Sequence, residues 1–384
     1  MRSTTKLLPS RTKNLGVLLL NNPRALHALT REMVDCLDDV LRAWKNDPTL
    51  EAILIKSSSK ETKTLAFCVG GDMKSVYTQG LQQHQQQKEP EQPPPEDFFR
   101  HEYKVNHDIA TCIDTIPIIS LWNGFVMGGG VGISIHGKYR VATEKTILSM
   151  PECRIGLFPD VGSMWWMTRR LKQHAVANYL ALTGKQIGPA DLLYTGLATH
   201  YIPSSRLEDL EHALAEATAS ENEDNTIKND VVASILMSFH ESIPTDHCYL
   251  AINKQIIESS FGGESVEDIF TNLKEANTEF SRSTLETLEK MSPTSMKVTM
   301  EGLKRGASCK TIGEDLQMEY RMAKACVRPG LDFYEGIRSV LIDKDHSPKW
   351  NPSTLEEVTD DMIQEFFAPI ENEWTHIQSE PSRL

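Results

Sequence analysis

The chain has 384 residues and a mass of 43.2 kDa, a length that suits one large domain or two smaller ones. Hydrophobic residues make up 40% and charged residues 24%, which are ordinary values for a globular protein with a sizeable core. The net charge of −13 argues against a nucleic-acid surface, which needs clustered Lys and Arg, and no apolar run approaches the ~20 residues that cross a bilayer.

The first 150 residues alternate between short apolar runs and helical patterns. Thr30 can cap a helix whose apolar positions, from Val34 to Trp44, recur at helical spacing. A second helix is predicted at about 97–115, and a third begins at Gly128-Gly129-Gly130. Strands are predicted at residues 15–20, 52–56, 66–69, 117–122, 139–143 and 146–150. Strands that alternate with helices indicate an α/β fold.

The remaining organisation is marked by composition. The segment from Gln79 to Pro95 has a Gln cluster and three successive prolines, which predicts a flexible surface insertion. From about Asp160 the pattern is mostly helical. We therefore expect residues 1–205 to form the α/β core, and residues 206–384 to form a mainly helical C-terminal lobe and tail.

Cysteine usage and the two ends of the sequence bear on the compartment. The seven cysteines have no C-x-x-C spacing and predict reduced, mostly buried thiols of an intracellular protein. Residues 1–14 are basic, with no acidic residue before Glu32, as in a mitochondrial transit peptide, but an apolar run at Leu15 leaves little room for one. Ser382-Arg383-Leu384 is a conservative variant of the S-K-L peroxisomal signal, with a disordered polar tail as the alternative. The expected localisation is peroxisomal or mitochondrial.

Two glycine clusters are candidates for a pair of anion-binding amides. A carbonyl oxygen that gains negative charge during acyl transfer can be held by two converging backbone N–H groups. Gly70-Gly71 allows the backbone to approach a ligand, since no Cβ intervenes. Gly128-Gly129-Gly130 can begin a helix whose first amides are unpaired and whose dipole favours negative charge. For either cluster alone, an ordinary tight turn is the alternative.

Two carboxylates lie in apolar surroundings. Glu152 and Asp160 both fall within residues 147–161, where an unpaired carboxylate is costly to bury. Such groups are candidate bases or nucleophiles with a raised pKa. The alternatives are an exposed loop residue for Glu152 and a helix N-cap for Asp160. Glu102, taken by its position alone, is expected to lie on a solvated helix face.

Other chemistries have weaker support. The sequence contains no G-x-S-x-G elbow, no H-E-x-x-H motif and no phosphate-binding loop, and its histidines do not cluster at metal-ligand spacing. Cys153 could act as a thiol nucleophile, but no His lies nearby in the sequence to activate it. A buried, inert thiol is therefore the favoured interpretation.

Together these segments resemble the crotonase (enoyl-CoA hydratase/isomerase) superfamily and, within it, the 3-hydroxyisobutyryl-CoA hydrolase branch. The resemblance covers about residues 15 to 367, and the run Asp343–Trp350 is more specific to the hydrolase branch than the other motifs. The matching segments are CVGGDM from Cys68, WNGFVMGGGVGISIHGKYRVATEKTILSMPECRIGLFPDVG from Trp122, ALTG from Ala181, MSPTS from Met291, MEYR from Met318, FYEGIR from Phe333 and LIDKDHSPKW from Leu341.

The resemblance implies a fold and a set of roles. The fold is a crotonase-like ββα spiral core with a helical C-terminal lobe. Gly71 and Gly129 are implied as the oxyanion-hole donors, and Glu152 as the catalytic carboxylate with Asp160 as its partner. CoA is part of the substrate, so neither a cofactor nor a metal is implied. The residues implied to contact the acyl-CoA are Glu102, Gly70, Gly71, Asp72, Gly128, Gly129, Glu152 and Asp160.

One position narrows the reaction. Hydratases of this superfamily hold a water molecule with two glutamates, one of which corresponds to Glu152 while the other falls on Gly132. The chain therefore lacks half of the acid–base pair of a hydratase. Thioester hydrolysis needs only one carboxylate, an oxyanion hole and a proton source for the leaving thiolate. Glu152 is then the nucleophile or general base, with Asp160 orienting the hydroxyl or water, and both a covalent anhydride and direct attack by water stay open.

The leading hypothesis is hydrolysis of a short-chain β-hydroxyacyl-CoA, with 3-hydroxyisobutyryl-CoA from valine breakdown as the expected substrate. The competing hypotheses are an enoyl-CoA hydratase or isomerase and a non-catalytic, mitochondrial ribosome-associated relative. The retained Glu152 and Asp160 and the acidic charge argue against the last. The expected partner is an acyl-CoA substrate, with no nucleic acid and no membrane. A homo-oligomer also stays open, because the superfamily often forms trimers.

Two departures from the family pattern are notable. Ser163-Met164-Trp165-Trp166 is bulkier than the glycines and aromatic residue usual in the family, and we expect it to reshape the acyl pocket. His27 replaces a common Asn near the first helix that faces CoA, a change that we expect to be tolerated.

Overall fold

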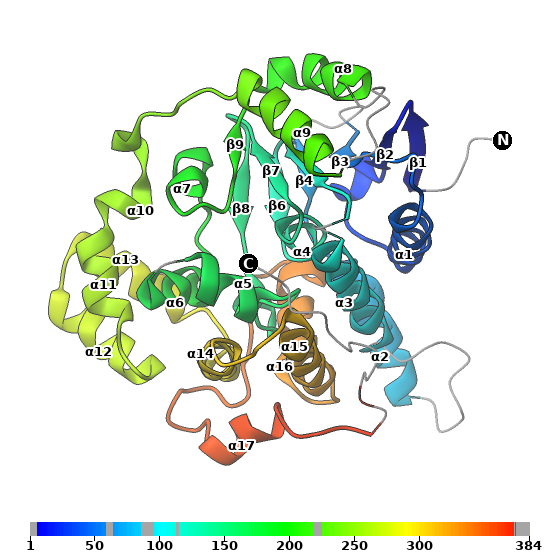
Figure 1. Ribbon diagram of the computed structural model, residues 1–384. Coiled ribbons are helices and arrows are strands. Elements are labelled where there is room, and N and C mark those ends of the chain that lie inside the picture. The colour runs from blue at the N-terminus through cyan, green and yellow to red at the C-terminus, as the bar shows by residue number, and fades with distance from the viewer. Residues whose placement is uncertain are drawn as a thin grey trace. The chain divides into compact units, whose positions relative to one another are not determined.

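The computed structural model describes residues 6–58, 64–85, 96–112, 115–171, 173–217, 225–371 and 373 (Figure 1). Contacts divide the chain into two units, neither of which is continuous in sequence. Unit 1 comprises Met1–Gly71, Lys104–Leu148 and Ile187–Ala251, and unit 2 comprises Asp72–Tyr103, Ser149–Gln186 and Ile252–Leu384. Within the described ranges, no helix combines the length and apolar character needed to cross a membrane.

Unit 1 is built on a six-stranded sheet in the order β1-β2-β3-β5-β7-β9 (Figure 1). Strand β1 is antiparallel to β2, and the remaining neighbours are parallel. A second sheet has the order β4-β6-β8. The strands are β1 (Leu7–Thr12), β2 (Leu15–Leu20), β3 (Ala52–Ser57), β4 (Ala66–Cys68), β5 (Ile118–Trp122), β6 (Phe125–Met127), β7 (Tyr139–Ala142), β8 (Ile147–Ser149) and β9 (His200–Tyr201). The helices are η1 (Pro23–Ala25), α1 (Arg31–Lys45), α4 (Gly129–Ile135), α7 (Pro189–Tyr194), η3 (Ser204–Arg206), α8 (Leu207–Ala217), α9 (Asn225–Phe239), η4 (Thr245–His247) and α10 (Tyr249–Ile252).

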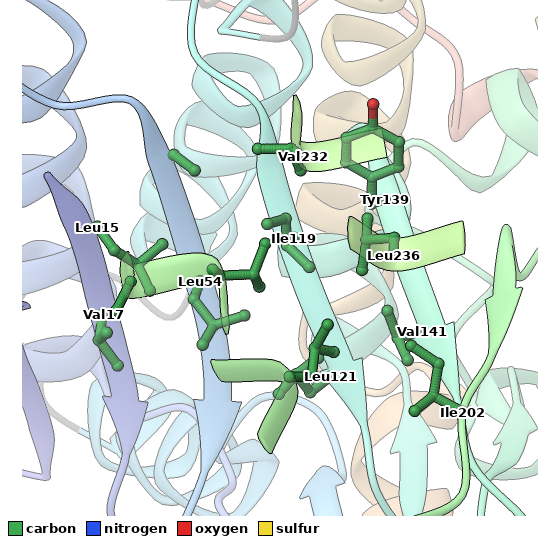
Figure 2. Close-up of a cluster of buried hydrophobic side chains, with 14 residues drawn as sticks. Leu15, Val17, Leu54, Ile119, Leu121, Tyr139, Val141, Ile202, Val232 and Leu236 are labelled. Atoms are coloured by element: carbon green, nitrogen blue, oxygen red, sulfur yellow. The ribbon is translucent and has the colours of Figure 1, made fainter. Parts of the chain in front are cut away.

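The inner strands β2, β3, β5 and β7 of the large sheet are buried on both faces, which explains why they read as nearly continuous apolar runs. Figure 2 shows the cluster on one face, where alternate residues of β2, β3, β5 and β7 meet Val232 and Leu236 of α9. On β2 the opposite face carries Gly16, where a Cβ would lie 2.6 Å from the Trp44 ring of α1. Glycine at this position therefore lets α1 lie directly against the strand.

Unit 2 is mainly helical. Small residues bring α14 close to α5: a Cβ on Gly306 would lie 2.6 Å from Cβ of Met164 and 2.7 Å from its carbonyl oxygen. Helix α3 (Glu96–Thr111) begins in unit 2 and ends in unit 1. The other helices are α2 (Met73–Gln85), η2 (Glu152–Ile155), α5 (Ser163–Arg170), α6 (His174–Thr183), α11 (Lys254–Phe261), α12 (Val266–Ala276), α13 (Glu279–Leu288), α14 (Pro293–Gly306), α15 (Ile312–Cys326), α16 (Asp332–Ile337), η5 (Arg338–Ile342) and α17 (Asp360–Glu365).

The structure confirms the α/β class and the predicted strands at β2, β3, β4, β5, β7 and β8. Thr30 caps α1 as expected, since its hydroxyl accepts a hydrogen bond from the Met33 amide at 3.4 Å. Three strands were missed, namely β1, β6 and β9, and each is exposed, short or polar. The boundary between the two contact-defined units does not lie at residue 205, because α8 and α9 belong to unit 1. The division of the sequence at that residue stays a prediction.

The expected insertion from Gln79 to Pro95 begins as a helix. Residues 79–85 complete α2, where a Cβ on Gly80 would lie 2.2 Å from the Tyr334 hydroxyl and the Tyr77 and Tyr334 rings are 5.9 Å apart. These aromatic contacts account for the helix at a polar, Gln-rich sequence. Positions 86–95 lie outside the described residues, as does the C-terminal Ser382–Leu384.

Candidate active site

The two glycine clusters of unit 1 lie next to each other. Gly70 has a φ of +104°, and its carbonyl oxygen accepts a hydrogen bond from the Leu29 amide at 2.8 Å. A Cβ on Gly70 would lie 3.4 Å from the backbone nitrogen of Gly129. The structure therefore brings together the two loops that carry the predicted oxyanion donors.

Helix α4 begins at the second cluster. Gly128 has a φ of +46°, Gly129 is the first helical residue, and a Cβ on Gly130 would lie 2.3 Å from the Cys68 carbonyl oxygen. Within the described part of the chain, neither the Gly71 nor the Gly129 amide donates a hydrogen bond to the backbone or to a side chain. Two unpaired donors in one loop pair can hold an anionic oxygen, and the positive end of α4 favours negative charge there. Gly132, where a hydratase would carry its other glutamate, is buried inside α4.

Unit 2 contains the three predicted carboxylates, all buried. Glu102 on α3 is 2% exposed, and Glu152, the first residue of η2, and Asp160 are each 6% exposed. The prediction of a solvated Glu102 is wrong, because the face of α3 that carries it is packed rather than exposed. Asp160 is not a helix cap: its Oδ2 accepts a hydrogen bond from the Tyr103 hydroxyl at 2.9 Å, and the N-cap position of α5 is Gly162.

The three carboxyl groups affect each other. Burial raises the pKa of Glu102 and of Glu152 well above the ordinary value, and the charge of Asp160 raises both further. Burial raises the pKa of Asp160 to about 7, against the opposing hydrogen bond from Tyr103. Like charges that share a buried site in this way disfavour full ionisation of the cluster.

Two of these carboxylate oxygens are left without a partner. Oε1 of Glu102 and Oε2 of Glu152 are buried and form no hydrogen bond within the ranges that the structure describes. A buried polar atom of this kind carries a desolvation cost that a ligand or water can relieve. Glu102 and Glu152 are thus the members of the cluster with a carboxylate oxygen available for a further hydrogen bond.

Two further buried acids, Asp315 and Glu319 of α15, and Tyr103 of α3 were not predicted from the sequence to have a role. Both acids are 0% exposed and accept hydrogen bonds from amides at the start of α5. Burial raises the pKa of Asp315 to about 7. Burial also raises the pKa of Glu319, and the charges of Asp315 and Asp160 raise it further. Acidic residues four apart on an apolar helix face were a signal that could have been read from the sequence.

Three other sequence predictions concern neighbouring residues. Asp72 caps the start of α2, where its carboxylate accepts hydrogen bonds from the hydroxyl and amide of Ser75, so a role in substrate binding stays a prediction. Cys153 is buried as expected, and burial raises the pKa of its thiol to about 12. The bulky residues Met164, Trp165 and Trp166 are buried in α5.

The substituted His27 occupies a tight turn at a φ of +60° and is 2% exposed. Its Nδ1 accepts a hydrogen bond from the Asn22 amide at 3.1 Å, and its Nε2 is 3.1 Å from the Ser58 carbonyl oxygen. The ring is therefore the Nε2–H tautomer, and burial lowers its pKa. The imidazole provides local hydrogen bonds that tie the turn after β2 to the end of β3.

A family model described as enoyl-CoA hydratase/isomerase matches residues 15–367. The chain therefore belongs to the enoyl-CoA hydratase/isomerase family and has the crotonase fold. Two solved structures agree over almost the whole chain. A carnitinyl-CoA dehydratase from Mycobacterium thermoresistibile is 30% identical with a TM-score of 0.82, covering 96% of this chain and 98% of its own. An enoyl-CoA hydratase from Rhodobacter sphaeroides is 32% identical with a TM-score of 0.80, covering 95% and 98%.

Curated relatives are nearer in sequence than these solved structures. The mitochondrial 3-hydroxyisobutyryl-CoA hydrolase of Xenopus laevis is 41% identical over 92% of this chain and 86% of its own length. The human enzyme of that name is 40% identical over the same shares, and the Gallus gallus enzyme is 38% identical over 96% and 90%. The similarity thus extends over both units.

Proposed function

We propose that this protein hydrolyses a short-chain β-hydroxyacyl-CoA thioester, with 3-hydroxyisobutyryl-CoA as its substrate. The observation that carries the proposal is Glu152: a buried carboxylate with an unpartnered oxygen, while the position of a hydratase's other glutamate is held by Gly132. Relatives with 38–41% identity are 3-hydroxyisobutyryl-CoA hydrolases, which supports the same substrate.

In the proposed reaction, the thioester oxygen is held by the Gly71 and Gly129 amides while its carbon is attacked. Glu152 either attacks that carbon directly, which gives a mixed anhydride that water then opens, or removes a proton from the attacking water. In both routes the C–S bond breaks, and the products are the free acid and CoA thiol. Asp160, held by Tyr103, orients the hydroxyl or water, and a carboxyl group of the cluster supplies the proton for the thiolate. No cofactor is required.

The test is release of free thiol from 3-hydroxyisobutyryl-CoA by the wild-type protein and by the Glu152→Gln variant. The proposal expects steady thiol release that the variant loses. Absence of thiol release by the wild type, together with consumption of a 2-enoyl-CoA, would instead establish the hydratase alternative. After a single turnover in ¹⁸O-water, label in the peptide containing Glu152 would establish the anhydride route, because direct attack by water places the label only in the product acid.

We also infer that the protein acts in mitochondria, where valine is degraded. The support is the word mitochondrial in the names of its hydrolase relatives. The C-terminal Ser382–Leu384 favours the peroxisome instead. Deleting these three residues from a tagged protein separates the two compartments: a mitochondrial signal that does not change supports the inference, whereas loss of a peroxisomal signal contradicts it.

A further inference from the structure

The turn that follows Asp160 has an unusual backbone. Val161 has a φ of +58° and Gly162 a φ of +80°, so two successive residues lie in the left-handed region. Glycine adopts this conformation readily, but a β-branched valine rarely does so and needs outside restraint. The turn is closed by a hydrogen bond from the Ser163 amide to the Asp160 carbonyl oxygen at 3.1 Å. Any relaxation of the turn would therefore move Asp160.

The restraint comes from α15. Glu319 accepts a hydrogen bond from the Gly162 amide at 2.7 Å through Oε2 and from the Met164 amide at 3.1 Å through Oε1. The N-cap residue of α5 is Gly162, which has no side chain to bond these amides. Both oxygens of one buried carboxylate thus fix the strained turn and the first turn of α5 together.

Asp315 lies one helical turn before Glu319 and makes a related but different contact. Its Oδ2 accepts a hydrogen bond from the Trp165 amide at 3.1 Å, farther along α5. Asp315 and Glu319 are therefore both buried acids that cap α5, yet only Glu319 bonds the turn that carries Asp160. This difference supplies a matched control.

We propose that Glu319 is a positioning residue for Asp160, holding the Val161–Gly162 turn so that the Asp160 carboxylate keeps its bond to Tyr103 and its direction toward the reacting groups. The inference rests on the proposed function, in which Asp160 orients the hydroxyl or water. Glu319 itself touches backbone amides and no reacting atom. A displacement of about 1 Å at a catalytic group can lower a rate by roughly 100-fold, so a remote carboxylate can control turnover in this way.

Several titratable and charged groups around Glu319 affect its ionisation. Asp315 on α15, Asp160 on the turn and Tyr103 on α3 interact with it directly through their charges. The thiol of Cys309 faces the same carboxylates, and Arg169 of α5 faces Asp315. A change at Glu319 therefore alters the acid limb of the pH–rate profile both by moving Asp160 and by changing the charge beside it.

The experiment compares Glu319→Gln with Asp315→Asn in the thiol-release assay, over a range of pH and substrate concentration. Gln has the shape of Glu but places an NH₂ group against one of the two amides, so the turn loses one of its acceptors. We expect Glu319→Gln to lower kcat by about 10- to 100-fold with little change in KM, and to displace the acid limb. Asp315→Asn is expected to keep kcat close to the wild-type value while lowering thermal stability, because Asp315 bonds the Trp165 amide and not the turn.

Equal losses of kcat in the two variants, or an unchanged kcat in Glu319→Gln, would overturn the proposal. If Glu319→Gln does not fold, Glu319→Asp replaces it, since the shorter side chain cannot reach both amides and should also lower kcat. An inactive wild type would refute the proposed function instead. In that case crystal structures decide the positioning role: Glu319→Gln should break the 2.9 Å bond between Tyr103 and Asp160, and an unmoved turn refutes it.

Discussion

Replacing Tyr103 by Phe removes one hydroxyl group from the carboxylate cluster and leaves the ring in place. In the wild type that hydroxyl donates to Asp160 Oδ2 at 2.9 Å, in a site where both side chains are buried. The hydrogen bond favours ionised Asp160, whose pKa burial raises to about 7. Without it the carboxyl group should hold its proton to higher pH, and the ionised Asp160 needed to orient the nucleophile should become scarce.

The magnitude follows from the strength of this bond. A hydrogen bond to a charged acceptor contributes about 1.5–3 kcal/mol, and about 1.4 kcal/mol corresponds to a tenfold change in an acid constant. The acid limb of the kcat/KM profile should therefore move to higher pH by about one to two units. At neutral pH the variant's kcat/KM should be about 5- to 50-fold below that of the wild type, and near pH 9 most of this difference should disappear.

The assay is thiol release as a function of pH. Tyr320→Phe is the matched control, because it removes another buried phenol hydroxyl, one that accepts a hydrogen bond from Arg100 at 3.2 Å rather than donating to Asp160. This variant should keep the acid limb of the wild type. An unmoved limb in Tyr103→Phe, or an equal movement in both variants, would refute the reasoning.

Three further predictions concern single positions. Glu152→Gln should lower thiol release by about 10²- to 10⁴-fold without lowering the free energy of unfolding in urea at pH 7, because the buried carboxyl group that it replaces lacks a full set of partners. Asp160→Asn should change the pH dependence of stability. Because the pKa of Asp160 is raised to about 7 in the folded protein, its protonated form stabilises the wild type, and this stabilisation is complete below the ordinary pKa of an aspartate. In urea titrations, the advantage of the wild type over the variant should disappear as pH rises through 7. Gly130→Ala should lower the free energy of unfolding by about 1–3 kcal/mol and should also lower activity, because its Cβ would lie 2.3 Å from the Cys68 carbonyl oxygen. Gly188 has open space around it, so Gly188→Ala should change neither quantity appreciably.

Much of unit 1 could be predicted because its signals are local. Parallel strands buried on both faces are short continuous apolar runs, and β2, β3 and β5 are of that kind. Strand β1 lacks that signal, because four of its six residues are exposed and its pairing with β2 depends on register rather than on burial. The division into units could not be read from composition, since each unit is assembled from segments far apart in the sequence.

For the site, single residues were easier to identify than their surroundings. The glycines were recognisable because close backbone approach excludes a Cβ, and Glu152 and Asp160 because their neighbours are apolar. Glu102 was misjudged from position alone, since a Glu within a polar helix gives no sign that its face is packed. The bond between Tyr103 and Asp160 joins residues 57 positions apart, and no spacing rule predicts such a pair.

The burial of acidic side chains around Asp160 in unit 2 poses an energetic problem, and its solution separates structural from reactive groups. Asp315 and Glu319 accept hydrogen bonds from amides of α5, so their burial is offset by bonds that also start a helix. Asp160 receives one bond, from Tyr103, while an oxygen of Glu102 and one of Glu152 receive none among the described residues. The cost of burial is thus concentrated on the groups proposed to meet the substrate. A bound acyl chain with a β-hydroxyl group would supply the missing donor, which gives a physical reason for preferring a β-hydroxyacyl thioester to an unsubstituted one.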